Sequence, residues 1–407
     1  METEFVLHSF KKLESYCSQE TWKGWDPYDG LNSKLFQAIP FVKNWDLARL
    51  AWIQAFKRNP FNLRKLLLIP KDYNPKGVGL SLTGYCNLFR LNQNSGKNIL
   101  DYSSDTILAK IRQLADLLLS LQSKGYSGSC WGYNFDWQAR RLFLFPKGTP
   151  TVVATTFCSA ALLDAYSITK ENIYLETALS SASFVLNDLK RTFTGAGFLF
   201  SYSPLEGNNT VYNASLMGSK LLSLCYSYDK KEEYLTAARG SIQACIENQN
   251  KDGSWFYGRL PVQNWIDSFH TGYNLESIVT YQNMSGDYSY SREVEKGFDF
   301  YINHFFLEDG RAKYYHNKTY PIDIHCPAQL FVTLGKMDKF GSHKDLADKV
   351  MKWAILNMQD KKGYFYYQIK PGLSSKISYM RWSNAFMFYA MTYYLLNRFK
   401  SYEKNKN

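Results

Sequence analysis

The sequence predicts an all-α protein whose helical hairpins close into an (α/α)6 toroid, with short β-like turns at one mouth of the ring. Three observations predict this fold. Apolar helical segments recur every 55–58 residues, charged amphipathic helices alternate with them, and a glycine-aromatic turn follows each charged helix. The chain of 407 residues also exceeds the roughly 250–300 residues at which one ordinary core stops growing, which favours growth by repetition.

The inner layer of the toroid is predicted from segments that open with small or polar residues and continue with apolar ones, such as "HTGYNLESIVTY". A helix that is apolar on all sides is expected to be buried. Successive starts lie 58, 57, 55 and 56 residues apart, and a sixth segment precedes the first of them by 74 residues. The starts are Thr155, Asn213, His270, His325 and Arg381, with the sixth segment at Ser81.

The outer layer is predicted from amphipathic helices with charges on one face, for example "DTILAKIRQLADLLLSLQ" and "HKDLADKVMKWAILNMQ". Residues 1–75 add about three helices and the turn "WKGWDPYDGLNS", which form either a seventh hairpin or a plug. No linker or low-complexity segment interrupts the chain. We therefore expect one domain over residues 1–407, with N-terminal helices and a mouth loop in 1–75 and repeated hairpins in 76–400.

Composition narrows the possible partners. The net charge is +12, and the basic residues are scattered, so they indicate either a solvated surface or attraction to an anionic partner. Such a partner would be a uronic-acid polymer, a phosphorylated lipid carrier or a membrane surface. Nucleic acid is not expected, because no basic helix, zinc-finger spacing or RNA-binding signature is present. The aromatic content of 17% is suited to a sugar-stacking groove or an aromatic-lined cavity.

The seven cysteines include no CxxC pair, and several lie in apolar helical stretches. This usage fits a reducing compartment. The opening "METEFVLHSFKK" lacks the basic-then-apolar design of a signal peptide, and no run approaches roughly 18 apolar residues. A cytoplasmic location is therefore expected.

Candidate catalytic residues follow from the repeat, because the first residues of the inner helices should meet at one mouth, where free backbone N–H groups favour anions. The segment "NWIDSFHTGYNLES" places His270 and Tyr273 on one helix face, three positions apart. His270 is either a general acid or base, or an N-terminal histidine bonded to backbone. His325 recurs at the same register. A His/Tyr pair flanked by Arg381 could take a proton from a uronate C5 and stabilise the resulting anion.

The acidic residues near these helix starts are also compatible with a glycosidase mechanism. Asp267, Asp323 and Asp136 are candidate acid/base carboxylates, or each could cap the helix that follows it. Arg381 and Arg140 could bind a carboxylate or phosphate with two hydrogen bonds, or form an intramolecular salt bridge. The predicted catalytic set is His270, Tyr273, His325, Arg381, Asp267 and Asp323.

Substrate binding is assigned to tryptophans and polar residues at the same mouth. Trp131, Trp137 and Trp382 could present flat apolar surfaces to a sugar ring, whereas Trp255 is expected to join adjacent hairpins and Glu276 to be structural. The full predicted binding set is Trp131, Asp136, Trp137, Arg140, Asn213, Trp382 and Asn384.

No metal or cofactor is expected. His270, His325 and Cys326 could approach one another across neighbouring hairpins, but no HxxxH or CxxC spacing supports a metal site. The sequence also lacks a glycine-rich phosphate loop, a GxSxG elbow and a dinucleotide fingerprint.

The stretch "IENQNKDGSWFYG" resembles the Gln…Asp-Gly-Ser-Trp element of the squalene-cyclase and prenyltransferase toroids. The same toroid houses six-hairpin glycosidases, sugar 2-epimerases and uronate polysaccharide lyases. Over most of the chain, "GWDPYDGLNS", "WGYNFDWQAR", "PTVVATTFCSAALLDAY" and "DSFHTGYNLES" resemble proteins of bacterial capsule and exopolysaccharide clusters. These resemblances identify a family and leave the reaction open, because a fold does not determine a function.

Charge, aromatic content and resemblance together predict a carbohydrate-active protein of capsular or exopolysaccharide biosynthesis. Its expected partner is an anionic glycan or a lipid-linked glycan, with peripheral association with the membrane biosynthesis machinery. The expected reaction is proton abstraction, by a lyase or epimerase, or hydrolysis. One alternative is a terpenoid or polyprenyl-handling enzyme, although the Asp-x-Asp-Asp motif of protonating cyclases is absent. The other is a non-catalytic glycan-binding subunit.

Overall fold

The computed structural model describes residues 2–96, 98–139 and 143–404. Within them, inner helices pack side by side into a closed ring, since α4 contacts both α6 and α14 while the others contact their neighbours in order. The predicted (α/α)6 toroid is confirmed. The inner helices are α4 (Pro75–Ser95), α6 (Val152–Thr169), α8 (Tyr212–Asp229), α10 (Ser268–Ser285), α12 (His325–Lys336) and α14 (Phe386–Lys404), the last preceded by the π-helical turn η5 (Met380–Ala385).

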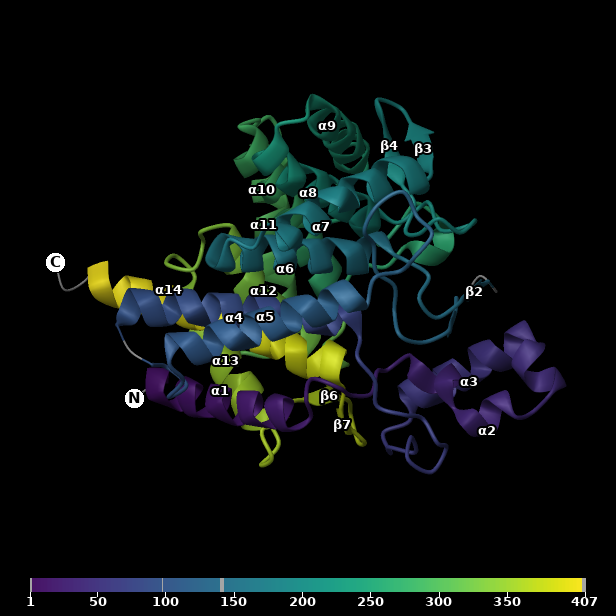
Figure 1. The fold of residues 1–407 in the computed structure, drawn as a ribbon, viewed down its shortest axis with the longest axis horizontal. Coiled ribbons are helices and arrows are strands. Elements are labelled where there is room, and N and C mark those ends of the chain that lie inside the picture. Colours follow the sequence, from purple (N-terminus) through teal and green to yellow (C-terminus); the bar gives the residue numbers. More distant parts are fainter. Residues whose placement is uncertain (1, 97, 140–142, 405–407) are drawn as a thin grey trace.

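The outer helices cover this ring (Figure 1). They are α5 (Ser104–Ser120), α7 (Asn172–Ser183) with its π-helical extension η3 (Phe184–Asp188), α9 (Glu232–Ile246), α11 (Ser291–Phe305), α13 (Lys344–Met358) and α1 (Glu2–Gln19). Inner helices are buried over most of their surface, whereas outer helices bury one face. In the described part of the chain, α6 alone has the length and composition of a possible membrane span, and 67% of that span is buried inside the protein.

The sixth hairpin is made from the two ends of the chain. Gly253, Gly310 and Gly363 occupy equivalent turns with φ of +91°, +90° and +102°. A Cβ at each would strike a main-chain carbonyl of the next outer helix, on α11, α13 and α1 respectively. Helix α1 therefore takes the outer position beside α14, with which it packs (Figure 1). The seven-hairpin alternative is wrong for the described residues, because α1 fills the sixth pair.

Short antiparallel strands lie beside the starts of the inner helices. β1 (Trp137–Gln138) pairs with β2 (Leu144–Phe145), and β3 (Arg191–Thr194) pairs with β4 (Gly197–Phe200). β5 (Ile322–Asp323), β6 (Tyr366–Ile369) and β7 (Ser375–Ser378) form a sheet in that order, with Ile322 opposite Ile369. Because β5 leads directly into α12, this sheet positions the start of that helix.

Residues 29–68 form a separate lobe at the same side of the ring. It contains η1 (Asp29–Asn32), α2 (Lys34–Gln37), η2 (Phe41–Asn44) and α3 (Asp46–Arg58), and Figure 1 shows α2 and α3 standing off the body. The lobe has a small core of its own, formed by Leu31, Phe36 and Ile53. Buried Arg64 donates to Asp29 at 2.8 Å and ties the lobe's end to its beginning.

Two expectations about structural residues are confirmed. Trp255 is buried, donates from its indole N–H to the Cys245 carbonyl at 3.0 Å and lies against Gly297 of the next hairpin. Glu276 of α10 forms a buried ion pair with Lys220 of α8. The seven cysteines are all buried and unpaired.

Candidate functional site

A cavity of about 280 Å³ opens where the inner helices begin. Its volume is near the lower end of the roughly 300–1,000 Å³ typical of small-molecule sites. Each inner segment of the described chain contributes to it from its first turn, as the repeat predicts. The contributing residues include Lys76, Val153, Asn213, His270, His325 and Arg381.

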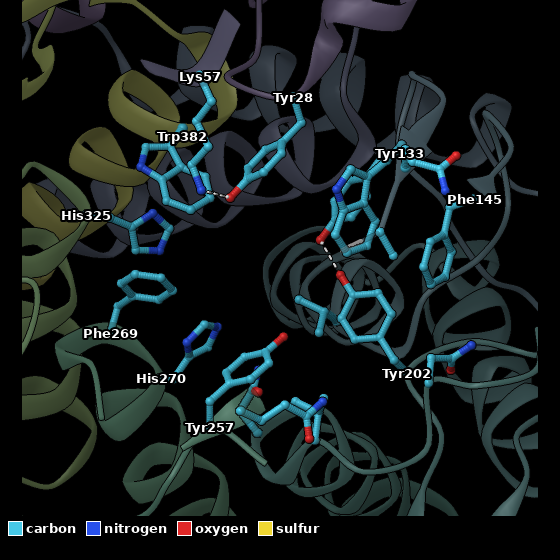
Figure 2. A pocket seen from close by; sticks show the side chains of 18 of the residues that line it. Tyr28, Lys57, Tyr133, Phe145, Tyr202, Tyr257, Phe269, His270, His325 and Trp382 are labelled. Carbon is cyan, nitrogen blue, oxygen red and sulfur yellow. Dashed lines mark hydrogen bonds between the residues drawn. The ribbon is translucent and has the colours of Figure 1, made fainter. Parts of the chain in front are cut away.

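Aromatic rings make up most of the cavity wall. Figure 2 shows Tyr28, Tyr133, Tyr202 and Tyr257 around the opening, with Trp382 on the side of His325. The charged residues on the described wall are Lys57, Lys76 and Arg381, and none of the described lining residues is Asp or Glu. Such a wall offers flat apolar surfaces to a sugar ring and a positive field to an anionic group.

His270 is held ready for proton transfer by Asp267. The Asp267 carboxylate caps α10 by accepting the His270 backbone N–H at 3.0 Å, and its second oxygen lies 2.7 Å from His270 Nδ1. Donation from Nδ1 leaves Nε2 as the basic nitrogen. In the described chain no hydrogen bond reaches Nε2, and the side chain is 21% exposed. This arrangement suits a general base.

A second proton-transfer group lies beside it. Tyr273 Oη is 2.6 Å from His325 Nε2, and Lys76 Nζ donates to the same Oη at 3.2 Å. Burial lowers the pKa of Lys76 and of His325, and nearby cations lower both further. Burial also raises the pKa of Tyr273. Near neutral pH the phenol and the imidazole are therefore both neutral, and the tautomer of His325 decides which of them donates the hydrogen bond.

The two groups are close but separate. The ring centroids of His270 and Tyr273 are 5.9 Å apart. The Phe269 ring lies between the two imidazoles, 4.2 Å from His270 and 4.7 Å from His325, as Figure 2 shows. The cavity thus presents a half-buried imidazole and a buried Tyr-His pair that do not contact each other through hydrogen bonds among the described residues.

Arg381 does not offer the free two-pronged clamp that was expected for a substrate carboxylate. Its Nε and Nη2 donate to Asp26 at 2.6 and 2.8 Å, and both side chains are 4% exposed. Arg381 therefore forms an intramolecular salt bridge, which was the other predicted role for it. Arg381 still lines the cavity and contributes positive charge to its wall.

The predicted carboxylates lie behind the wall. Asp323 is fully buried and accepts from Trp382 Nε1 at 2.8 Å, Gln368 Nε2 at 2.6 Å and the His325 N–H at 3.0 Å. Burial raises the pKa of Asp323 to about 6, although these three hydrogen bonds act to lower it. Neither it nor Asp267 lines the main cavity. Of the two alternatives, the capping role describes Asp267, and Asp323 accepts from the first N–H of α12, so both carboxylates are engaged by groups that they position.

Some of the predicted substrate-binding residues line the cavity and others do not. Trp137, Trp382 and Asn213 line the cavity, and the buried Asn213 Oδ1 has no hydrogen-bond partner among the described residues, so it can accept from a ligand hydroxyl. Trp131 does not belong to this set. It is 0% exposed and donates to the Leu118 carbonyl at 2.8 Å, so it packs an outer helix against the ring.

Of three further predicted binding residues, two do not line the cavity and one lies outside the described residues. Asn384 is fully buried and accepts from the Phe365 N–H at 2.8 Å, which gives it a structural role. Asp136 accepts from the Lys147 N–H at 2.7 Å and is not among the lining residues. Arg140 lies outside the described residues.

The sequence interpretation missed Lys76 because it started the first inner helix at Ser81. Helix α4 begins six residues earlier, at Pro75, and Lys76 follows at once. Proline at the first helical position is a recognised start signal and could have located it. Lys57 of the lobe and Tyr28, just before the lobe, were also missed, because only long-range packing brings them to the cavity.

Solved structures with the same fold include enzymes named for reactions on sugars. A cellobiose 2-epimerase from Bacillus thermoamylovorans aligns with a TM-score of 0.61 and 14% identity over 81% of this chain and 90% of that one. A mannosidase of glycoside hydrolase family 76 from Bacteroides thetaiotaomicron gives 0.63 and 13% over 98% and 100%. A polysaccharide lyase gives 0.59 and 11% over 99% of both chains. No family model matches, and no curated protein is similar by sequence. At these identities the likeness shows the toroid fold.

Proposed function

We propose that this protein is a carbohydrate-active enzyme that removes a proton from a carbon atom of a glycan, as an epimerase or a lyase. One observation supports this reaction class above the others. The His270 base oriented by Asp267 and the Tyr273 phenol bonded to His325 face one aromatic cavity whose described wall holds no carboxylate.

The reaction follows from these positions. His270 Nε2 takes the proton from the carbon next to a carbonyl or carboxylate, and negative charge develops on the attached oxygen. Lys57 and Arg381 line the cavity and add positive field, and Lys76 Nζ lies within hydrogen-bond distance of Tyr273 Oη. Tyr273 then gives its proton either to the opposite face of the carbon, which inverts it, or to the departing glycosidic oxygen. Its phenol is reprotonated through His325.

Hydrolysis has less support. The usual glycosidase mechanism uses two carboxyl groups on either side of the scissile bond, roughly 5–9.5 Å apart. Asp267 and Asp323 are instead engaged behind the wall. The same lack of an acidic lining residue weighs against a protonating terpenoid cyclase. A binding-only role does not explain why two groups suited to proton transfer face one cavity.

The substrate class is the finer part of the proposal. Lys57, which forms no ion pair with a described residue, and Lys76, whose lowered pKa a bound anion would raise, support an anionic, uronate-type glycan. Structures of the same fold include a cellobiose epimerase and a polysaccharide lyase. A cytoplasmic role in building capsular or exopolysaccharide, on a free or lipid-linked chain, rests on the sequence resemblance.

The test is hydrogen exchange at carbon. Purified protein is incubated in D₂O with uronate-containing oligosaccharides and with neutral disaccharides, and products are followed by NMR. We expect deuterium to enter one ring carbon, or an unsaturated sugar to form. His270→Asn and Tyr273→Phe should abolish this, whereas His304→Asn and Tyr288→Phe, which lie outside the cavity, should not. Cleavage that gives neither deuterium at carbon nor an unsaturated sugar, or full activity in the two cavity variants, would overturn the proposal.

A further inference from the structure

Large hydrophobic side chains are exposed mainly on the N-terminal lobe. Half of those in the described chain, nine of eighteen, lie within residues 35–68. Exposed apolar residues scattered singly need no explanation, but a concentration of them marks an interaction site. The nine are Leu35, Ile39, Phe41, Trp45, Leu47, Phe61, Leu63, Leu66 and Leu68, with Phe41 90% and Leu66 72% exposed.

These side chains belong to one compact lobe. The elements η1, α2, η2 and α3 pack on one another around their small core. The loop that carries the last four apolar residues is fixed to them, because Ser33 Oγ donates to the Leu67 carbonyl at 2.7 Å. Arg64 from the same loop is buried against Asp29. The apolar side chains are therefore presented by an ordered surface, which we term the lobe surface (residues 34–71).

Basic residues are interleaved with the apolar ones. Residues 34–71 contain eight Lys or Arg and a single acidic residue, Asp46, which pairs with Arg49. Lys43 stands between Phe41 and Trp45, and Lys65 precedes Leu66. The exposed basic residues of this surface are Lys34, Lys43, Arg58, Lys65 and Lys71, of which Lys71 is paired with Glu20.

We infer that the lobe surface docks on an anionic lipid bilayer. Aromatic and aliphatic side chains surrounded by Lys and Arg are the composition of interfacial segments, in which apolar groups enter the headgroup boundary while cations contact anionic lipid. A conventional protein interface is depleted of Lys at its centre. The excess of positive charge thus favours lipid over a protein partner or a second copy of this chain.

Docking at this surface would place the cavity next to the membrane. Gln54 and Lys57 of α3 line the cavity, while Phe41, Trp45 and Leu47 are exposed. One lobe thus supplies both cavity-lining residues and the side chains that would contact lipid. The consequence for substrate rests on the proposed function: a glycan attached to a lipid carrier would reach the cavity without leaving the bilayer.

The experiment is co-sedimentation of the full chain with vesicles of phosphatidylcholine, with and without phosphatidylglycerol. We expect binding to the anionic vesicles that weakens with salt. Phe41→Ser/Trp45→Ser should weaken it at least about tenfold, and Lys43→Gln or Lys65→Gln about fivefold each. Phe193→Ser/Leu356→Ser, which removes exposed apolar groups from the toroid, is the matched control and should bind as the wild type does.

Several results would overturn the inference: no binding to anionic vesicles, equal binding to neutral ones, or equal loss in the toroid control. A lobe variant that turns a dimer into a monomer would also overturn it, because the surface would then join two copies. Thermal melts confirm that each variant is folded. Failure of the proposed function is separately visible, since His270→Asn should still bind vesicles and Phe41→Ser/Trp45→Ser should still process a soluble glycan.

Discussion

The buried pair of Lys220 on α8 and Glu276 on α10 offers a quantitative test of how the toroid holds α10, the helix that carries His270 and Tyr273. Their side chains are 7% and 1% exposed. Burial raises the pKa of Glu276, but the charges of Lys220 and Lys336 outweigh it and leave that pKa lowered. Burial also lowers the pKa of Lys220. The pair therefore exists as two charges that depend on each other.

Lys220→Met should lower the free energy of unfolding by about 3–5 kcal/mol, because it strands a buried carboxylate. Only Gln329, at 3.5 Å, would remain as a donor to Glu276 from another helix. Lys220→Met/Glu276→Leu should recover most of this loss, since an apolar pair of similar volume is often as stable as the ions. Lys339→Met breaks an exposed pair with Glu295 and should have little effect.

The pH dependence of the free energy of unfolding tests the same interpretation. In the wild type the lowered pKa of Glu276 adds stability above its unfolded pKa of about 4.3, and this is lost as the pH falls. In Lys220→Met only Lys336 remains of the two cations that lower this pKa, so the pKa rises relative to the wild type and the deficit in stability grows as the pH rises through it. Chemical denaturation at about pH 5 and about pH 8 should show a larger deficit at the higher pH. A deficit under about 1 kcal/mol, or one independent of pH, would refute the reasoning.

Three further predictions concern the ring and the cavity. Gly297→Ala should destabilise the protein by about 1–3 kcal/mol in denaturation, because its Cβ would lie 2.7 Å from a tryptophan ring. Gly341→Ala meets no atom within 4 Å, and equal loss there would contradict this. An anionic glycan should bind with proton uptake, because negative charge raises the low pKa values of Lys76 and His325. Affinity should therefore fall as the pH rises. Calorimetry in buffers of different ionisation enthalpy measures the uptake, and proton release would disprove it. Asp267→Asn should keep the helix cap and the stability but lower turnover about 10²–10⁴-fold, whereas unchanged turnover would show that the imidazole needs no anion.

Local patterns account for most of what the sequence predicted correctly. Thr155, Asn213, His270, His325 and Arg381 lie within three residues of the observed helix starts, because apolar periodicity and N-terminal polar residues act within one turn. The first inner helix was placed six residues late, since the polar and apolar residues after its proline blur the start.

Long-range packing accounts for the rest. The position of α1 as the sixth outer helix depends on where the ring closes. The residues of α1 alone do not predict which inner helix it covers. The ion pair between Asp26 and Arg381 joins residues 355 positions apart. Without it, Arg381 resembles a free anion clamp. The contact of Asp267 with His270, by contrast, lies within one turn and could be anticipated as a cap.

The most direct test of the central claim is a structure of the protein with a bound, unreactive uronate oligosaccharide. We predict a sugar ring against Trp382 or Trp137, with one ring carbon in reach of both His270 Nε2 and Tyr273 Oη. A glycan bound at the other end of the toroid would contradict this account. So would one in the cavity that turns only hydroxyl groups toward these two side chains.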